Sequence, residues 1–357
     1  PYLRWGQISP NTIYWAIKDI EKSGTLPRAK LKSFSRRIIW RDLAYFQLCT
    51  FPDMHSKPIR SHYKAHPWVE DREIIRRWQR GQTGFPMVDA GMRELWKTGW
   101  IQQSVRMIVA SFLVEYLGVN WIEGHKWFHD TLVDQDTAIN AMMWQNAGRC
   151  GIDQWNFVLD ATSGFQDPTG SYVRRWCPEL KHLPNKYLHK PWEANEATLR
   201  KAGVQLGSTY PTRILTDLKK ARLRTKENAL AMLRTPESVK MTDPNGYDLI
   251  TIPGKGISRV FTRREFRNRK PDDPKNYESK DQKRITSFFQ KDIARNKSHS
   301  KGKRKDRSRQ SKEVEKDNNA RRQEKKKARM LKKKFKEKTR GRMNGGKRAL
   351  TRADFED

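Results

Sequence analysis

The chain has 357 residues, with 74 Lys and Arg against 40 Asp and Glu, and a formal net charge of +34. It contains no run of eighteen apolar residues, which argues against a membrane-spanning helix. Its three scattered cysteines, Cys49, Cys150 and Cys177, argue against a disulfide framework and a cysteine metal site, and they fit a reducing compartment.

Charge and apolar bulk are divided unevenly along the chain. All thirteen Trp occur by residue 192, whereas residues 216–357 hold 45 of the 74 Lys and Arg and 20 of the 40 Asp and Glu. The first part can bury a core, but the second cannot offset its ordering entropy. We predict a helical domain over residues 1–200, a linker with a small hairpin over 201–300, and a disordered basic tail over 301–357.

The elements of the first part follow a helical pattern. Residues 11–23 open with Asn before an apolar-periodic run, and residues 32–48 carry apolar groups at helical spacing. Two further helices are expected between residues 86 and 117, where Pro starts the first and Gly ends each of them. Residues 124–148 carry the same helical pattern. Alternating strand patterns are scarce before residue 215, so the fold class is predicted to be all-α.

Two later segments read differently. Residues 167–184 are rich in turn residues and proline, which predicts a long ordered loop with short helices. Residues 247–266 are expected to form a small hairpin around Pro253 and Gly254, to which the sequence assigns no function. The first residues already read as the inside of a fold, so an upstream segment is expected.

The stretch "DQDTAINAMMWQNAG" (residues 134–148) combines two carboxylates, a lone amide and an indole on an apolar helix. Arg106 lies in another apolar run, where an unpaired charge would be costly. We therefore expect Arg106 to pair with Asp134 or Asp136, and the sequence leaves both open. A purely structural ion pair is the simpler alternative for these residues.

Several motifs occur together in a characteristic order. In that order they resemble the flavin-binding helical domain of the cryptochrome/photolyase family over about residues 1–195, and "AMMWQNAGRCGIDQWNF" is most similar to plant and algal photolyase-like blue-light receptors. The other motifs are "PYLRWGQISP", "TGFPMVDAGMREL", "TGWIQQSVRM", "NWIEGHKWF", "DQDTAINAMMW" and "YVRRWCPEL".

The resemblance implies FAD as the cofactor, bound inside the helical bundle. It implies that Asp134 and Asp136 face the cofactor, with Asp134 paired to Arg106. It also places Asn140 opposite flavin N5, where a neutral amide can form a hydrogen bond but is a poor proton donor. An antenna pigment, folate or deazaflavin, would belong to a preceding α/β domain that this sequence lacks. No metal site is predicted. The positions that match the cofactor wall are Arg37, Trp40, Arg41, Trp100, Gln103, Arg106, Asp134, Gln135, Asp136 and Asn140.

The resemblance also implies a chain of tryptophans that passes electrons to photoexcited flavin. Trp144 matches the position nearest the flavin, Trp121 the middle one, and Trp68 the outermost. Stacked indoles are easily oxidised and would allow short hops instead of one long tunnelling step. Plain core packing is the alternative for any single Trp in a chain that has thirteen.

The pocket in which photolyases hold a pyrimidine dimer is only partly matched. Trp40 and Met107 agree, but Asn146 stands where the repair enzymes have a second Trp, and Arg37 stands where they have Glu. Losing one stacking face would cost about 1–3 kcal/mol of base binding. We expect a blue-light photoreceptor photoreduced through the tryptophans. The alternative is a light-driven photolyase that repairs cyclobutane pyrimidine dimers, which would make the protein an enzyme.

The basic tail contains one further motif. "QKRITSFF" matches the box that docks on the replication sliding clamp, with Gln282 in a polar pocket and Ile285, Phe288 and Phe289 as a hydrophobic plug. The alternative is an apolar cluster that packs back on the helical domain. The Lys/Arg runs that follow favour nuclear import and phosphate contact with DNA, although the sequence does not exclude the chloroplast.

Overall fold

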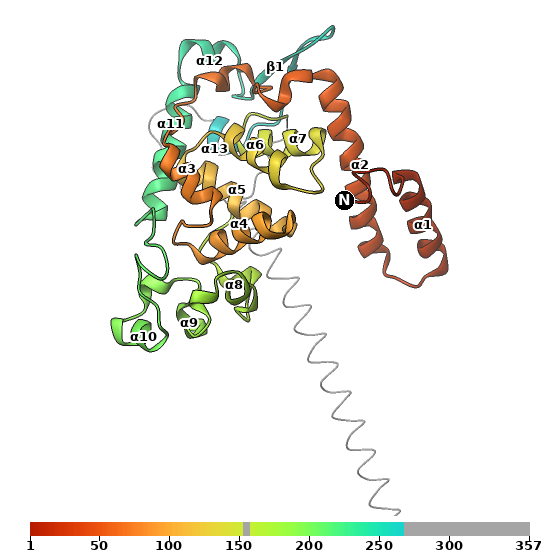
Figure 1. Cartoon of the computed structure of the whole chain (residues 1–357). Coiled ribbons are helices and arrows are strands. Elements are labelled where there is room, and N and C mark those ends of the chain that lie inside the picture. Colours follow the sequence, from red (N-terminus) through yellow and green to blue (C-terminus); the bar gives the residue numbers. More distant parts are fainter. Residues whose placement is uncertain (153–157, 268–357) are drawn as a thin grey trace, which may run out of the picture. The chain divides into compact units, whose positions relative to one another are not determined.

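The fold is known from a computed structural model that describes residues 1–152 and 158–267. Helices dominate these two ranges (Figure 1), which confirms the predicted all-α class. Among these residues, no helix combines the length and the apolar character needed to cross a bilayer. The clamp-box residues and the Lys/Arg runs predicted for the tail lie outside the described residues.

Two antiparallel helices open the fold. Helix α1 (Pro10–Ser23) is capped by the Ser9 side chain, which accepts a hydrogen bond from the Thr12 amide, and it ends at Gly24 in the left-handed region. Helix α2 (Arg28–Thr50) follows and packs against α1 and α7. The short 3₁₀ helices η1 (Pro52–His55) and η2 (Ser61–Ala65) then lead into the bundle.

The central bundle buries the main core. Its core cluster is apolar, with large side chains such as Trp78, Phe85, Leu95 and Val109 almost inaccessible to solvent, although the same helices also bury the carboxylates of Asp89 and Glu115. The elements are α3 (Arg72–Gln79), α4 (Pro86–Thr98), α5 (Gln103–Ser111) with its π-helical continuation η3 (Phe112–Leu117), α6 (Trp121–Thr131) and α7 (Thr137–Ala147). The apolar residues that recur at helical spacing in the sequence therefore face this shared core.

The turn-rich segment forms short helices, as its sequence predicts. They are η4 (Gly164–Gln166), α8 (Ser171–Trp176), η5 (Pro178–Leu180), α9 (Asn185–Leu188), η6 (Pro191–Glu193) and α10 (Glu196–Lys201). Helix α8 packs against α4 and covers one side of the core. Proline at the start of η5 and η6 fits its pre-set backbone angle.

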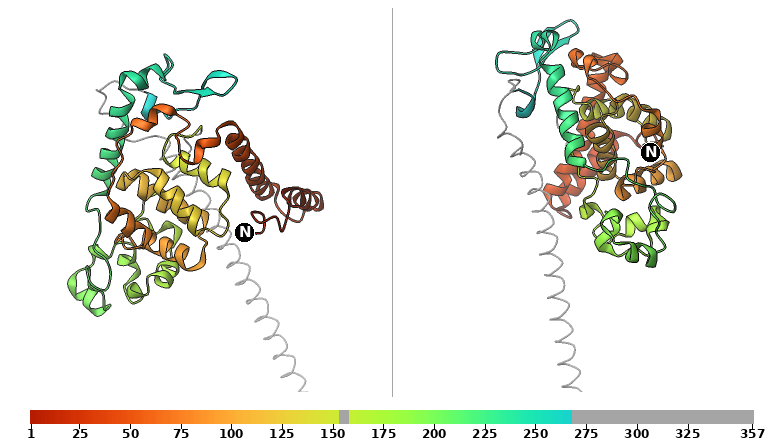
Figure 2. Two further views of the ribbon diagram at one scale, coloured as in Figure 1. Left: turned by 45° about the horizontal axis from the view of Figure 1, so that its top comes forward. Right: turned by 90° about the vertical axis from the view of Figure 1, so that its left-hand side faces the viewer.

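A C-terminal section then returns to the bundle. It consists of α11 (Leu218–Leu233), α12 (Pro236–Lys240), the antiparallel strands β1 (Leu249–Ile252) and β2 (Gly256–Arg259), and α13 (Arg264–Arg267). Helix α11 packs against η3 and η2 (Figure 2). Ile250 and Val260 of the hairpin join a second apolar cluster with Ala44 of α2 and Ala138 of α7. The predicted boundary at residue 200 stays a prediction, but packing against the bundle continues well beyond it.

Candidate functional site

The beginning of α7 is tied to α2 by a hydrogen-bonded carboxylate. Asp136 caps α7 by accepting a hydrogen bond from the Ile139 amide at 3.0 Å, and its other oxygen accepts from the Tyr45 hydroxyl at 2.8 Å. Burial and the neighbouring carboxylate raise the pKa of Tyr45, so its hydroxyl stays a donor. The Arg41 guanidinium lies 4.8 Å over the Tyr45 ring and extends this contact along α2. Tyr45 was not among the predicted site residues.

The partner of Arg106 is Asp134. The guanidinium Nη2 lies 3.1 Å and 2.9 Å from the two Asp134 carboxylate oxygens, and Nε donates to the Ile101 carbonyl at 2.8 Å. About one fifth of each side chain remains exposed, so the pair stands at the edge of the bundle. Asp136 is occupied by its capping role, which is why Asp134 takes the ion pair.

Gln135, between the two carboxylates, has an unused donor. Its side-chain Nε2 is buried and has no hydrogen-bond partner among the described residues, while its backbone carbonyl accepts from the Arg4 side chain. The Trp5 indole N–H donates to the neighbouring Val133 carbonyl at 2.8 Å. A buried amide donor is costly to leave unpaired, so this position suits a ligand with acceptor atoms.

Asn140 is held in place by α6. Asn140 is 8 % exposed, and its side-chain Nδ2 donates to the His125 backbone carbonyl at 3.1 Å. Burial and the nearby His129 and His55 lower the pKa of His125 to about 4, so its ring is neutral at physiological pH. The Asn140 amide and the His125 ring are therefore both uncharged. His125 was also missed by sequence reasoning.

Two glycines allow the indoles of α6 and α7 to pack unusually closely. A Cβ atom on Gly124 of α6 would lie 2.1 Å from the Trp144 ring, and one on Gly148 would lie 2.3 Å from the Trp121 ring. Both indoles are 2 % exposed. Gly124 of α6 thus lies against the tryptophan of α7, and Gly148, directly after α7, lies against the tryptophan of α6, which fixes both rings where α6 and α7 meet.

Trp144 is also enclosed by aromatic rings that the sequence did not single out. Trp78 meets it edge-on with ring centroids 6.4 Å apart, and Phe128 does so at 5.1 Å. The Trp78 indole N–H donates to the Val109 carbonyl at 3.1 Å. Nothing in the local sequence distinguishes Trp78 from an ordinary core tryptophan.

Trp68 packs at the edge of the same core cluster as Trp121. Its ring centroid lies 4.0 Å from that of His66. Burial, and then the charge of Arg149, lower the pKa of His66 to about 3. The place of Trp68 at the outer end of an electron path stays a prediction.

The other predicted residues lie on α2, α5 and the end of α7. Trp40 is half-buried against the cluster that contains Ala138, whereas Arg37 is exposed. Trp100, just before α5, is 43 % exposed, Gln103 is exposed and Met107 is half-buried. Asn146 is 5 % exposed, near the end of α7.

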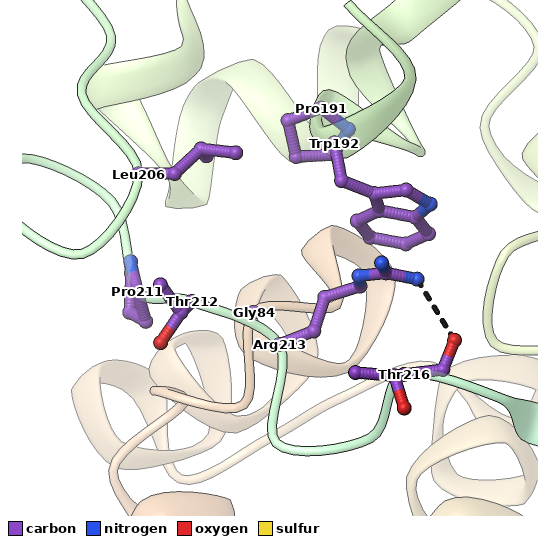
Figure 3. Close-up of a pocket in the computed structure, with 8 residues that line it drawn as sticks. All are labelled: Gly84, Pro191, Trp192, Leu206, Pro211, Thr212, Arg213 and Thr216. Atoms are coloured by element: carbon purple, nitrogen blue, oxygen red, sulfur yellow. Dashed lines mark hydrogen bonds between the residues drawn. The ribbon is translucent and has the colours of Figure 1, made fainter.

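A separate hollow of about 230 Å³ lies near η6 and contains none of the predicted flavin residues (Figure 3). There the Arg213 guanidinium lies 4.4 Å from the Trp192 ring and donates to the Thr216 carbonyl at 3.2 Å. In the described ranges, no group of three or more His, Cys, Asp or Glu side chains is arranged to hold a metal ion.

Comparison with known proteins decides the family. Residues 34–231 match the family model described as the FAD binding domain of DNA photolyase. The chain belongs to the DNA photolyase/cryptochrome family. It is 42 % identical over 239 residues to a deoxyribodipyrimidine photo-lyase of Agrobacterium fabrum, which covers 66 % of this chain and 49 % of that protein. It is 38 % identical over 237 residues to Cryptochrome-1 of Arabidopsis thaliana, which covers 62 % of this chain and 34 % of the relative.

Solved structures of the photolyase/cryptochrome family agree with this assignment. The crystal structure of a bacterial class III photolyase from Agrobacterium tumefaciens matches with a TM-score of 0.62 and 42 % identity, covering 66 % of this chain and 49 % of that one. This chain therefore spans about half of that photolyase.

FAD is accordingly the cofactor of this domain, and the side chains present fit it. The unpaired Gln135 amide offers a donor, and Arg106 supplies a cation whose charge favours an electron-rich flavin. Asn140 of α7 adds a neutral amide. When bound, FAD absorbs blue light and accepts electrons. The protein's part would be to hold the ring system and exclude water.

Proposed function

We propose that the protein is a blue-light photoreceptor whose FAD is photoreduced through Trp144, Trp121 and Trp68. The burial of Trp144 and Trp121 and the close approach of each ring to a glycine support this role, because rings held in fixed positions give electron hops of constant length. Arg106 and Asp134 would orient the cofactor, and Asn140 would form a hydrogen bond without supplying a proton.

The observation that favours sensing over repair is the burial of Asn146. It stands where the family's repair enzymes have a stacking tryptophan, but it is 5 % exposed and its side-chain oxygen lies against Gly151. An amide turned into the protein offers no stacking face to a flipped base. Arg37, exposed on α2, replaces the carboxylate of the repair pocket.

The alternative function is light-driven repair of cyclobutane pyrimidine dimers. The 42 % identity to a bacterial photolyase favours it, as does retention of Trp40 and Met107 from the lesion pocket. The photochemical part of the site serves both functions, so only the substrate side can separate them. The strongly basic composition suits contact with DNA in either case.

Purified protein loaded with FAD would be illuminated with blue light, first alone and then with dimer-containing DNA. Sensing predicts flavin bleaching without return of intact thymines, and repair at ordinary turnover would exclude a pure sensor. Trp144→Phe should abolish bleaching, whereas Trp176→Phe on α8 should leave it intact. Unchanged bleaching in Trp144→Phe would exclude the proposed electron path.

For the tail we propose docking on the replication sliding clamp and nuclear import. The sequence around Gln282, Ile285, Phe288 and Phe289 supports docking, because it offers a polar anchor followed by an apolar plug. A peptide of residues 278–294 should bind the clamp at micromolar concentration, and replacing both Phe by Ala should abolish that binding. Residues 301–340 fused to a fluorescent reporter should carry it into the nucleus; a reporter spread evenly through the cell would contradict import.

A further inference from the structure

The loop that follows α7 (residues 148–152, called the α7 loop) joins the tryptophan pair to the C-terminal section. It begins with Gly148, which lies against the Trp121 ring. Arg149 comes next and has a φ of +62°, the one positive φ of a non-glycine residue among the described residues. A left-handed backbone costs an L-residue about 1–2 kcal/mol. Contacts elsewhere must therefore hold this loop in place.

One set of contacts acts on Arg149. The side chain is 1 % exposed, its Nε donates to Glu115 Oε1 at 3.1 Å, and its Nη2 donates to the second carboxylate oxygen. Burial alone would raise the pKa of Glu115, but the charge and hydrogen bond of Arg149, together with the charges of Arg263 and Arg222, hold that pKa below its usual value. Phe266 of α13 covers the pair, with its ring 5.3 Å from the guanidinium carbon.

A second set acts through Arg60, which is fully buried. Its guanidinium donates to the carbonyls of Gly151 at 2.8 Å and Ile152 at 3.1 Å, both in the α7 loop. The same group donates to Asp248 Oδ2 at 2.6 Å and to the Thr262 hydroxyl at 3.0 Å. One cation therefore holds the α7 loop and the C-terminal hairpin together. The positive charge of Arg60 needs the Asp248 carboxylate as its partner, because an unpaired buried guanidinium would be strongly destabilising.

We propose that residues 248–266, which we call the clasp, position Trp121 for electron transfer. The clasp holds the α7 loop through its contacts with Arg60 and Arg149. The loop in turn holds Gly148 in place. The position of Gly148 then determines how the Trp121 ring lies against α7. Electron transfer between indoles slows steeply as their separation grows. The clasp thus controls the hop between Trp121 and Trp144. This inference rests on the proposed photoreduction.

The clasp can be loosened without removing a charge. Thr262→Val deletes the hydroxyl that binds Arg60, and Phe266→Leu removes the ring over Arg149 while keeping an apolar side chain. Thr251→Val is the matched control, since Thr251 is exposed on β1 of the same hairpin. Gly148→Ala moves the Trp121 ring directly and leaves the clasp contacts unchanged.

Two measurements would be made on each variant. The first is the NMR signal of the Trp121 indole N–H in FAD-free protein, assigned with Trp121→Phe. The second is the rate of flavin bleaching at equal FAD loading. We expect Thr262→Val, Phe266→Leu and Gly148→Ala to shift the Trp121 signal and to slow bleaching at least about threefold. Thr251→Val should change neither.

The outcomes separate the clasp from the photoreduction itself. If the parent protein does not bleach at all, the proposed function fails, but the Trp121 signal still reports whether the clasp positions the ring. If Thr262→Val and Phe266→Leu lower the melting temperature yet leave the Trp121 signal and the bleaching rate as in the parent, the clasp only stabilises the fold and the inference is overturned.

Discussion

Replacing Gly124 by Ala sets two known effects against each other. Within a helix, alanine is favoured over glycine by about 1 kcal/mol, so helix propensity alone predicts a more stable protein. At this position, however, the new methyl group would lie 2.1 Å from Cη2 and 2.3 Å from Cζ3 of Trp144. The Trp144 ring is buried between Trp78 and Phe128 and has no room to move aside. Overpacking of such a core costs about 1–3 kcal/mol.

We expect overpacking to win, with a net loss of about 1–2 kcal/mol, because the obstacle is a rigid ring held on two sides. For a domain of this size that loss lowers the melting temperature by roughly 2–8 °C. Bleaching should slow as well, because the displaced ring is the predicted first electron donor. Thermal unfolding and blue-light bleaching would be measured on the same FAD-loaded samples.

Gly91→Ala on α4 is the matched control. Its new methyl group would meet a Val105 side-chain carbon at 2.5 Å, so it also overpacks a helix contact, but no indole is involved. A similar loss of stability with unchanged bleaching is expected. A Gly124→Ala protein that melts higher than the parent and bleaches normally would refute the reasoning, since helix propensity would then have outweighed the contact with Trp144.

Three further outcomes are expected. Arg106→Gln should cost less than about 1 kcal/mol of stability, since the pair with Asp134 is partly exposed, but should weaken FAD binding at least about tenfold in a fluorescence titration. Tyr45→Phe should lower the free energy of unfolding in urea by about 0.5–1.5 kcal/mol, the contribution of one hydrogen bond. Because the pKa of His66 falls from 6.5 to about 3 on folding, the unfolded chain takes up the proton first and stability is lost as pH falls from 6.5 toward 3. At pH 5 the loss is about 2 kcal/mol, and urea unfolding of His66→Gln should show a correspondingly smaller difference between pH 7 and pH 5.

The sequence predicted the helical class because apolar spacing is a local property. Charge and spacing left open whether Arg106 pairs with Asp134 or Asp136, and only the family resemblance favoured Asp134. A local rule decides the matter: Asp136 stands directly before the first turn of α7, which is the position of a helix cap. Once Asp136 caps the helix, Asp134 is the partner that remains.

Other features of the site could not be predicted from local patterns. Gly124 looks like a weak point in a helix until the fold brings Trp144 against it. Arg60 and Asp248 are 188 residues apart in the sequence, and nothing near either one announces the pair. His125 acts through its backbone carbonyl, which every residue has. These contacts depend on which elements pack together.

The burial of Asn146 bears on the choice between the proposed sensing function and repair. Introducing the tryptophan of the repair enzymes would need space beside Gly151, where even an added Cβ atom would lie only 2.5 Å from the Asn146 side-chain oxygen. That space is occupied by the α7 loop, and Arg60 holds the loop by two of its carbonyls. Asn146→Trp should therefore destabilise the protein by about 1–3 kcal/mol without creating a stacking face.

The exposed Arg37→Glu substitution on α2 should be tolerated and serves as the control for expression and folding. Binding of dimer-containing DNA would be compared with binding of undamaged DNA for both variants and for the parent. If Asn146→Trp were stable and bound the lesion selectively, a single side chain would separate this site from the lesion pocket of the repair enzymes. If it is unstable, as we expect, the packing of the α7 loop excludes a tryptophan at this position, and one substitution cannot introduce a stacking face.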